Sequence, residues 1–200
     1  MLTTIEQLEA IYGQPHERAV KKEIPYVNED YRAFIDVAPF VVHATAGPDG
    51  LDCSPRGDAP GFVAVLDERT LVIPDRPGNR RVDTMLNVAE NPHLGLLFMV
   101  PGINETLRVN GTARFTKDAA LLAPLAVNGK APVASLVVAV DEVYFHCGKA
   151  LIRSRLWDPE SRVERRHFPT LGRILADQIA GMDAGHAEEV IDESYRSRLY

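Results

Sequence analysis

The residues best suited to chemistry form a basic segment in the middle of the chain, Asp75-Arg76-Pro77-Gly78-Asn79-Arg80-Arg81, hereafter the basic turn. It follows an apolar β-type run that ends at Ile73 and Pro74, and it precedes a helical pattern. A helix N-terminus offers free N–H groups and the positive end of the helix dipole, and arginine pairs bidentately with phosphate. The basic turn is therefore predicted to bind a terminal phosphate. The alternative is a solvated helix start with Asp75 as counter-ion.

A second polar group, Ser54-Pro55-Arg56-Gly57-Asp58, ends the first predicted hairpin. Its hydroxyl, guanidinium and glycine suit a ligand wall, and the alternative is a tight turn closed by an Arg56–Asp58 surface pair. His146 and Cys147 are adjacent on a predicted strand and point to opposite faces, so we expect no metal site. The sequence contains no G-x-S-x-G, G-x-G-x-x-G or Walker motif, and we assign no catalytic residue.

The elements that must position these groups are mainly β-strands. Apolar β-type runs alternate with turn signals between Pro39 and His146, and we expect about six antiparallel strands there. A sheet of this size protects its edges best by curling into a barrel. Helical patterns precede, interrupt and follow the strands, at about residues 5–12, 29–37, 82–89, 118–127, 170–179 and 186–200. The chain is interpreted as a single domain, residues 1–200, with a barrel core at about 39–157 and helical extensions at 1–38 and 158–200.

Composition excludes several classes of protein. The net charge of -6 argues against a surface that coats nucleic acid. No apolar run approaches the roughly 18 residues of a membrane span, and the first residues lack the features of a signal peptide. The two cysteines provide no disulfide framework. We therefore expect a cytoplasmic protein that binds neither nucleic acid nor membrane.

The motifs, in this order, resemble the pyridoxamine-phosphate-oxidase-like flavin-binding split barrels. The resemblance covers about Pro39 to Trp157 and is closest to a bacterial subgroup of FMN-dependent enzymes with unassigned substrates. It rests on the Ser54–Asp58 group, the basic turn, the Asn91-Pro92 helix stop, Glu105-Thr106-Leu107-Arg108-Val109-Asn110-Gly111, Phe145-His146-Cys147-Gly148-Lys149-Ala150 and Arg153-Ser154-Arg155-Leu156-Trp157. It implies a split β-barrel, Greek-key-like and six-stranded with peripheral helices. It also implies a homodimer with FMN at the subunit interface and an oxidoreductase acting on a small molecule.

The resemblance also assigns roles to residues. Arg80 and Arg81 hold the phosphate, and Asn79 stands beside them. The partner subunit contributes at His146 and at Arg153 or Arg155. The full set of implied cofactor contacts is Ser54, Pro55, Arg56, Ile73, Pro74, Asp75, Arg76, Asn79, Arg80, Arg81, Thr106, His146 and Arg153.

Two departures from the family pattern bear on activity. His146 stands where pyridoxamine-phosphate oxidases carry a tryptophan, and Leu151-Ile152-Arg153 replaces their Arg-Leu-His substrate motif. We therefore do not expect oxidation of pyridoxine phosphate. Three alternatives stay open: a barrel that uses deazaflavin or haem, with His43 or His146 as the haem ligand; a non-catalytic flavin-binding or redox-sensing protein; and a structural domain without a ligand.

Overall fold

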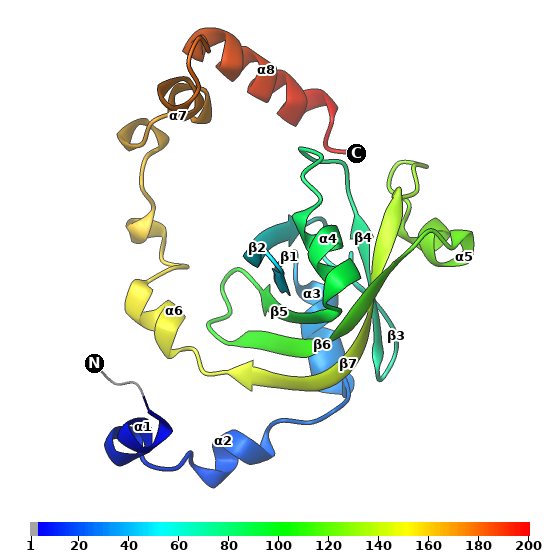
Figure 1. The fold of residues 1–200 in the computed structure, drawn as a ribbon, viewed down its shortest axis with the longest axis vertical. Helices are drawn as coiled ribbons and strands as arrows, with labels where there is room; N and C mark the ends of the chain where they lie inside the picture. The colour runs from blue at the N-terminus through cyan, green and yellow to red at the C-terminus, as the bar shows by residue number, and fades with distance from the viewer. Residues whose placement is uncertain (1–3) are drawn as a thin grey trace.

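The computed structural model describes residues 4–200, and its centre is one antiparallel sheet of seven strands (Figure 1). The strands lie in the order β2-β1-β5-β6-β7-β4-β3. Their bounds are β1 (Phe40–Gly47), β2 (Gly50–Gly57), β3 (Ala64–Asp67), β4 (Thr70–Asp75), β5 (His93–Met99), β6 (Thr106–Thr116) and β7 (Ala134–His146). The prediction of a mostly-β antiparallel fold with added helices is confirmed.

The predicted strand number was wrong by one, and the sheet is not closed. The short strand β3 pairs only with β4, while β2 pairs only with β1, so these two strands form free edges. The long strands β6 and β7 bend as they cross the molecule (Figure 1), and their register shifts between Asn110 and Gly111. A bulge of this kind increases local bending and twist. The result is an open, curled sheet that is consistent with a split barrel.

Helices occupy both ends of the chain and the connections between strands. They are α1 (Ile5–Tyr12), α2 (Glu17–Lys21), α3 (Glu29–Val37), α4 (Asp83–Glu90), α5 (Ala119–Leu122), α6 (Lys149–Ser154), α7 (Leu171–Gln178) and α8 (Ala184–Ser197), with short 3₁₀ turns at Ala123–Leu125, Pro159–Ser161 and Arg165–His167. The side chains of Thr4 and Asn28 cap α1 and α3, as expected for helix N-termini. No helix within residues 4–200 has the length and apolar character required to cross a membrane.

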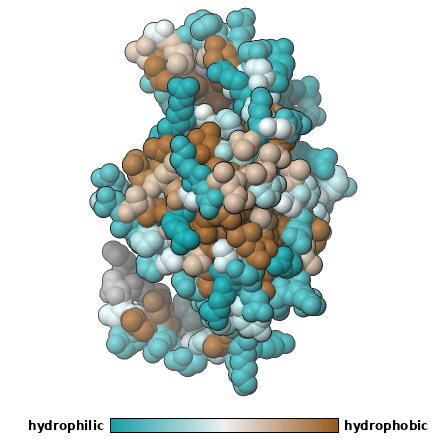
Figure 2. Space-filling view, turned by 90° about the vertical axis from the view of Figure 1, so that its right-hand side faces the viewer, coloured by the Kyte–Doolittle hydropathy of each residue, from teal (hydrophilic) through white to brown (hydrophobic). Residues whose placement is uncertain are grey.

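The main core fills the concave side of the sheet. Val41, Ile73, Leu96, Val109 and Val138, from five different strands, are each at most 1% exposed. A second, smaller cluster of Val72, Leu125 and Val137 lies beneath α5. In Figure 2, apolar side chains gather on the face that carries α5, β3 and β4.

Helix α4 packs closely on β1. Asn87 donates a hydrogen bond from Nδ2 to Thr45 Oγ1 at 3.1 Å. At Gly47 a Cβ atom would meet the Asn87 side-chain oxygen, so the two elements lie close together. These contacts hold α4 against β1.

The C-terminal part of the chain forms an arm. After β7 it passes through α6 and α7 and then returns along α8, so that its end lies beside the loop between β4 and α4 (Figure 1). Tyr200 at this end donates a hydrogen bond to Asp58, 142 residues earlier in the chain.

Candidate anion-binding site

The basic turn forms the connection between β4 and α4, just beyond the pairing of Pro74 with Ser135 of β7. Arg80 has a φ of 63°, in the left-handed region that residues other than glycine seldom adopt. The N–H of Arg81 donates to Asn79 Oδ1 at 2.9 Å, which stabilises the turn. Residues 77–82 are exposed, so the turn presents its cations to solvent.

Arg76 is held by the protein itself. Its Nε donates to Asp58 Oδ2 at 2.7 Å and its Nη1 donates to the carbonyl oxygen of Leu125 at 2.9 Å. The Asp58 side chain is only 3% exposed. Asp58 therefore pairs with Arg76 and not with Arg56, so the alternative of an Arg56–Asp58 surface pair is wrong.

The other two arginines of the turn differ in whether their guanidinium groups have a partner. Arg81 Nε donates to Asp83 Oδ2 at 2.9 Å, and both side chains are well exposed. Within residues 4–200, the Arg80 guanidinium has no hydrogen-bond or ion-pair partner. Arg80 is therefore the cation of the turn that is free to bind an anion.

A cavity of about 290 Å³ opens beside the turn, between the ends of β2 and β4 and the first residues of α4. It is lined by eight of the predicted contacts, namely Pro55, Arg56, Pro74, Asp75, Arg76, Asn79, Arg80 and Arg81. Ser54 and Ile73 do not line it, and Ile73 is buried in the core. The structure thus brings the two motifs of the sequence, Ser54–Asp58 and the basic turn, to one site.

A chain of polar contacts supports this cavity from behind. The Thr84 hydroxyl donates to Asp52 Oδ2 at 2.8 Å, and the Ser54 hydroxyl donates to the same oxygen at 2.9 Å. Arg56 Nη2 donates to Thr84 Oγ1 at 3.4 Å, so α4 helps to orient the guanidinium. Sequence reasoning missed Asp52 and Thr84, because no spacing signal links residues that are 32 positions apart.

The charge of the cavity favours an anion. Arg56, Arg80 and Arg81 line it together with one acidic residue, Asp75, besides the neutralised Arg76. Burial raises the pKa of Asp75, while the charge of Arg56 opposes that shift. Three arginines against one carboxylate leave the lining with an excess of positive charge, which favours an anion.

His43 lies deeper, inside the sheet, and is 2% exposed. Neither of its ring nitrogens has a hydrogen-bond partner within residues 4–200. Together with Arg56, Asp75 and Thr84 it lines a very small void under the main cavity. Its burial leaves no path for a haem to reach the imidazole, which disfavours His43 as a haem ligand.

Three predicted contacts lie elsewhere in this chain. Thr106 and His146 are paired at the start of β6 and the end of β7, and Thr106 is buried. Arg153 belongs to α6, which lies far from the β4–α4 loop in Figure 1. Arg155 follows α6 and forms ion pairs with Asp158 and Glu160. None of these residues lines the cavity at the turn. The contribution of His146 and of Arg153 or Arg155 to a partner subunit's site stays a prediction.

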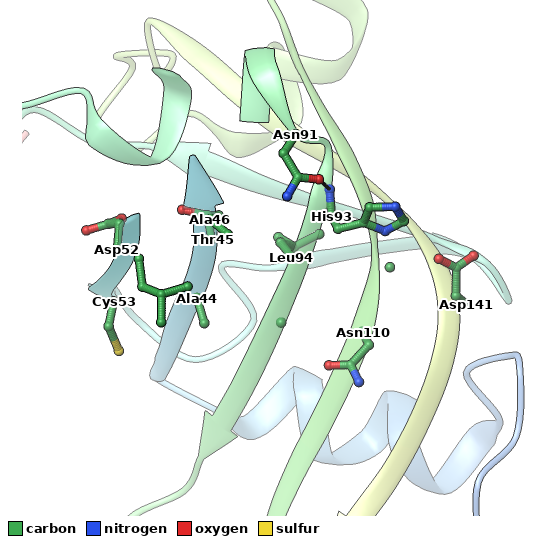
Figure 3. A pocket seen from close by; sticks show the side chains of 13 residues that line it. Ala44, Thr45, Ala46, Asp52, Cys53, Asn91, His93, Leu94, Asn110 and Asp141 are labelled. Carbon is green, nitrogen blue, oxygen red and sulfur yellow. Dashed lines mark hydrogen bonds between the residues drawn. The ribbon is translucent and has the colours of Figure 1, made fainter. Parts of the chain in front are cut away.

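A separate cavity of about 460 Å³ lies on the outer face of the sheet (Figure 3). Ala44 and Cys53 form one side, while Asn110 and Asp141 lie on the other. Asn110 Nδ2 donates to Glu142 Oε1 at 2.6 Å and is therefore already engaged. Because the lining contains aspartates but neither lysine nor arginine, this cavity does not suit an anion.

Comparisons with known proteins agree with this architecture. A family model described as "Pyridoxamine 5'-phosphate oxidase" matches residues 27–147. A histidine-to-alanine variant of HupZ from Group A Streptococcus has a TM-score of 0.50 and 16% identity, covering 60% of this chain and 99% of that chain. General Stress Protein 26 from Bacillus anthracis has a TM-score of 0.45 and 17% identity, and the match covers 57% of this chain and 88% of that chain. An FMN-binding protein from Syntrophomonas wolfei has a TM-score of 0.42 and 8% identity, and the match covers 58% of this chain and 88% of that chain. At such identities the first structure shows the fold alone. No curated protein sequence matched the chain.

Proposed function

Because the chain belongs to the pyridoxamine 5'-phosphate oxidase family, we propose that it is a flavoprotein that binds the phosphate of FMN at the basic turn. One observation carries the proposal: the unpaired Arg80 guanidinium lines a cavity that also contains Arg56 and Arg81. Phosphate is recognised by such convergent guanidinium donors, and the exposed N–H groups at the start of α4 add to them.

The size of the cavity agrees with the phosphate end of the cofactor. Pockets that enclose a whole drug-sized ligand measure about 300–1,000 Å³, whereas this one is about 290 Å³. This volume is at the lower end of that range, and we propose that the cavity takes the phosphate and part of the attached chain. Pro74 and Asp75, at the end of β4, form the wall from which the ring would extend.

A homodimeric split barrel is part of the proposal. Thr106, His146 and Arg153 do not line the cavity of their own chain. In a dimer, His146 and Arg153 of a second copy would contribute to this cavity, as the family resemblance implies. The arm from α6 to α8 is largely exposed, and we propose that it takes part in the contact between the subunits.

FMN, when bound, supplies one- and two-electron redox chemistry, while the protein supplies binding, orientation and electrostatics. In this chain Arg80, Arg81 and Arg56 bind the anion, and Asp52 and Thr84 orient Arg56. We therefore propose an oxidoreductase that transfers a hydride or electrons to or from a small molecule.

The absorbance spectrum of the purified protein, before and after addition of FMN, tests this function. We expect the two visible bands of bound flavin. A Soret band would identify haem, and a single band near the violet would identify deazaflavin. Bound FMN that no electron donor reduces would identify a non-catalytic flavin protein. A protein that gains no flavin from added FMN would refute the proposal.

Single arginine variants test the phosphate contact. A hydrogen bond to a charged group contributes about 1.5–3 kcal/mol, so Arg80→Ala should weaken FMN binding at least tenfold. Arg81→Ala should have a smaller effect, because Arg81 already pairs with Asp83. Arg69→Ala, in the exposed turn between β3 and β4, is the matched control. Riboflavin lacks the phosphate and should bind all four proteins equally; equal losses for FMN and riboflavin in Arg80→Ala would show that the turn does not read the phosphate.

A further inference from the structure

The basic turn borders a second cavity on its other side. This cavity measures about 930 Å³ and lies between the turn, the end of β2 and the returning C-terminal segment after α8. It shares Arg76 and Arg80 with the first cavity, but its third arginine, Arg198, and its aromatic surface come from residues 194–200. The two cavities are therefore neighbours that one loop separates.

The C-terminal wall is anchored at several points. Tyr200 Oη donates to Asp58 Oδ1 at 2.6 Å, and the Arg76 guanidinium carbon lies 5.7 Å from the centre of the Tyr200 ring. Lys130 Nζ donates to the Tyr200 carbonyl oxygen at 3.4 Å. Because Arg76 neutralises Asp58, the aspartate at this wall does not repel an anion.

The lining combines free positive charge with exposed apolar surface. The guanidinium groups of Arg80 and Arg198 both line the cavity, and neither has a side-chain partner in the described part of the chain. Tyr195 and Leu199, from the same wall, are 60% and 61% exposed. Two arginines beside an aromatic ring and a leucine form a site for a molecule with a charged end and an apolar body.

We propose that this cavity binds a small organic anion, with its carboxylate or phosphate between Arg80 and Arg198 and its apolar body against Tyr195 and Leu199. The volume lies within the range of about 300–1,000 Å³ that is usual for small-molecule sites. Arg198, Tyr195 and Leu199 do not line the cavity proposed for the FMN phosphate, so this site is distinct from it although the two share Arg80.

Calorimetric titration of the full chain, with FMN added, tests the site. The probes are benzoate and phenyl phosphate, which share the ring and differ in the anion, with benzyl alcohol as the neutral control. Both anions should bind saturably, and whichever binds more tightly identifies the charged group that the site prefers. Benzyl alcohol should bind at least tenfold more weakly than the better anion.

Variants of α8 and the residues after it separate this site from the FMN site. Arg198→Ala should weaken binding of the better anion at least tenfold and leave FMN affinity unchanged, because Arg198 lines only the second cavity. Arg196→Ala is the matched control, since Arg196 pairs with Glu193 and does not line the cavity. Arg198→Lys, which keeps the charge, should retain part of the affinity.

The outcomes are distinguishable. If neither anion binds while FMN does, the proposed function stands and this inference fails. If the anions bind without any FMN binding, the anion site stands and the flavin function fails. Equal affinities of the Arg198→Ala and Arg196→Ala variants, or equal binding of benzyl alcohol, would overturn the site.

Discussion

His43, buried beneath the basic turn, allows a test of how a histidine without hydrogen bonds to residues 4–200 affects the stability of the protein. Burial lowers the pKa of His43 from 6.5 to about 3; the charge of Arg56 acts in the same direction and that of Asp52 opposes it. Neither ring nitrogen has a partner within residues 4–200. The side chain therefore stays neutral in the folded protein at pH values where the unfolded chain takes up a proton.

This pKa difference makes the free energy of unfolding depend on pH. Between pH 6.5 and about 3 the unfolded chain binds more protons than the folded protein, so stability is full above pH 6.5 and falls as the pH falls. The linkage relation gives a loss of about 2 kcal/mol between pH 7.5 and pH 5.0 from this one group. A separate cost of about 1–3 kcal/mol, independent of pH, comes from burying a polar group without a partner.

Replacement of His43 by leucine, which is apolar and close in volume, removes both costs. By urea unfolding, His43→Leu should be more stable than the unmodified protein by about 1–3 kcal/mol at pH 7.5. The difference should widen by about 2 kcal/mol at pH 5.0. His93→Leu is the matched control: His93 lies exposed at the start of β5, so this variant should follow the unmodified protein at both pH values.

Two results would refute the reasoning. A His43→Leu variant that is less stable at pH 7.5 would show that the imidazole has a partner, such as a bound water molecule or a ligand. A difference that stays constant between pH 7.5 and pH 5.0 would show that the pKa of His43 is not lowered.

Three further predictions concern stability. In Gly111→Ala the new Cβ atom collides with the backbone oxygen of Ala139 in β7. This variant should lower the free energy of unfolding by about 1–3 kcal/mol in urea. Gly78→Ala is the control: its Cβ atom has no neighbour within 4 Å, so its stability should be unchanged. Asp58→Asn leaves the Arg76 guanidinium, 16% exposed, without its counter-ion and should cost about 2–3 kcal/mol by the same measurement; no loss would show that the pair does not stabilise the fold. Tyr200→Phe removes the hydrogen bond to Asp58 and should speed trypsin cleavage after Arg196 and Arg198, while an unchanged rate would show that the segment is held by other contacts.

Much of the fold was predictable because local patterns and tertiary structure agree. The seven strands lie between Phe40 and His146, which matches the predicted β region from Pro39 to His146, since β-type runs there alternate with clear turn signals. Helix α2 was missed because it has only five residues, all exposed, and carries no apolar stripe.

The site was predictable only in part, for a different reason. The basic turn and Arg56 were found because their residue types are unusual in those positions. Their supports were not found, because Asp52 contacts Thr84 and Asp58 contacts Tyr200 across 32 and 142 residues. Nothing in local sequence determines such contacts, since they depend on how α4 and the C-terminal arm pack on the sheet.

The three arginines of the basic turn look equivalent in the sequence but have different partners in the structure. Arg76 is tied to Asp58 and so anchors the turn, and Arg81 is engaged with Asp83. Arg80 has an unpaired guanidinium and a left-handed backbone with a φ of 63°. An exposed, unpaired guanidinium is available to an anion, whereas a guanidinium held by a buried carboxylate is not, so anion affinity should depend on Arg80 and stability on Arg76. Glycine adopts this φ freely, so Arg80→Gly should lose FMN affinity without losing stability. The reverse pattern, in which Arg80 variants unfold easily and Arg76 variants bind weakly but stay stable, would mean that Arg80 has a structural role and Arg76 binds the anion.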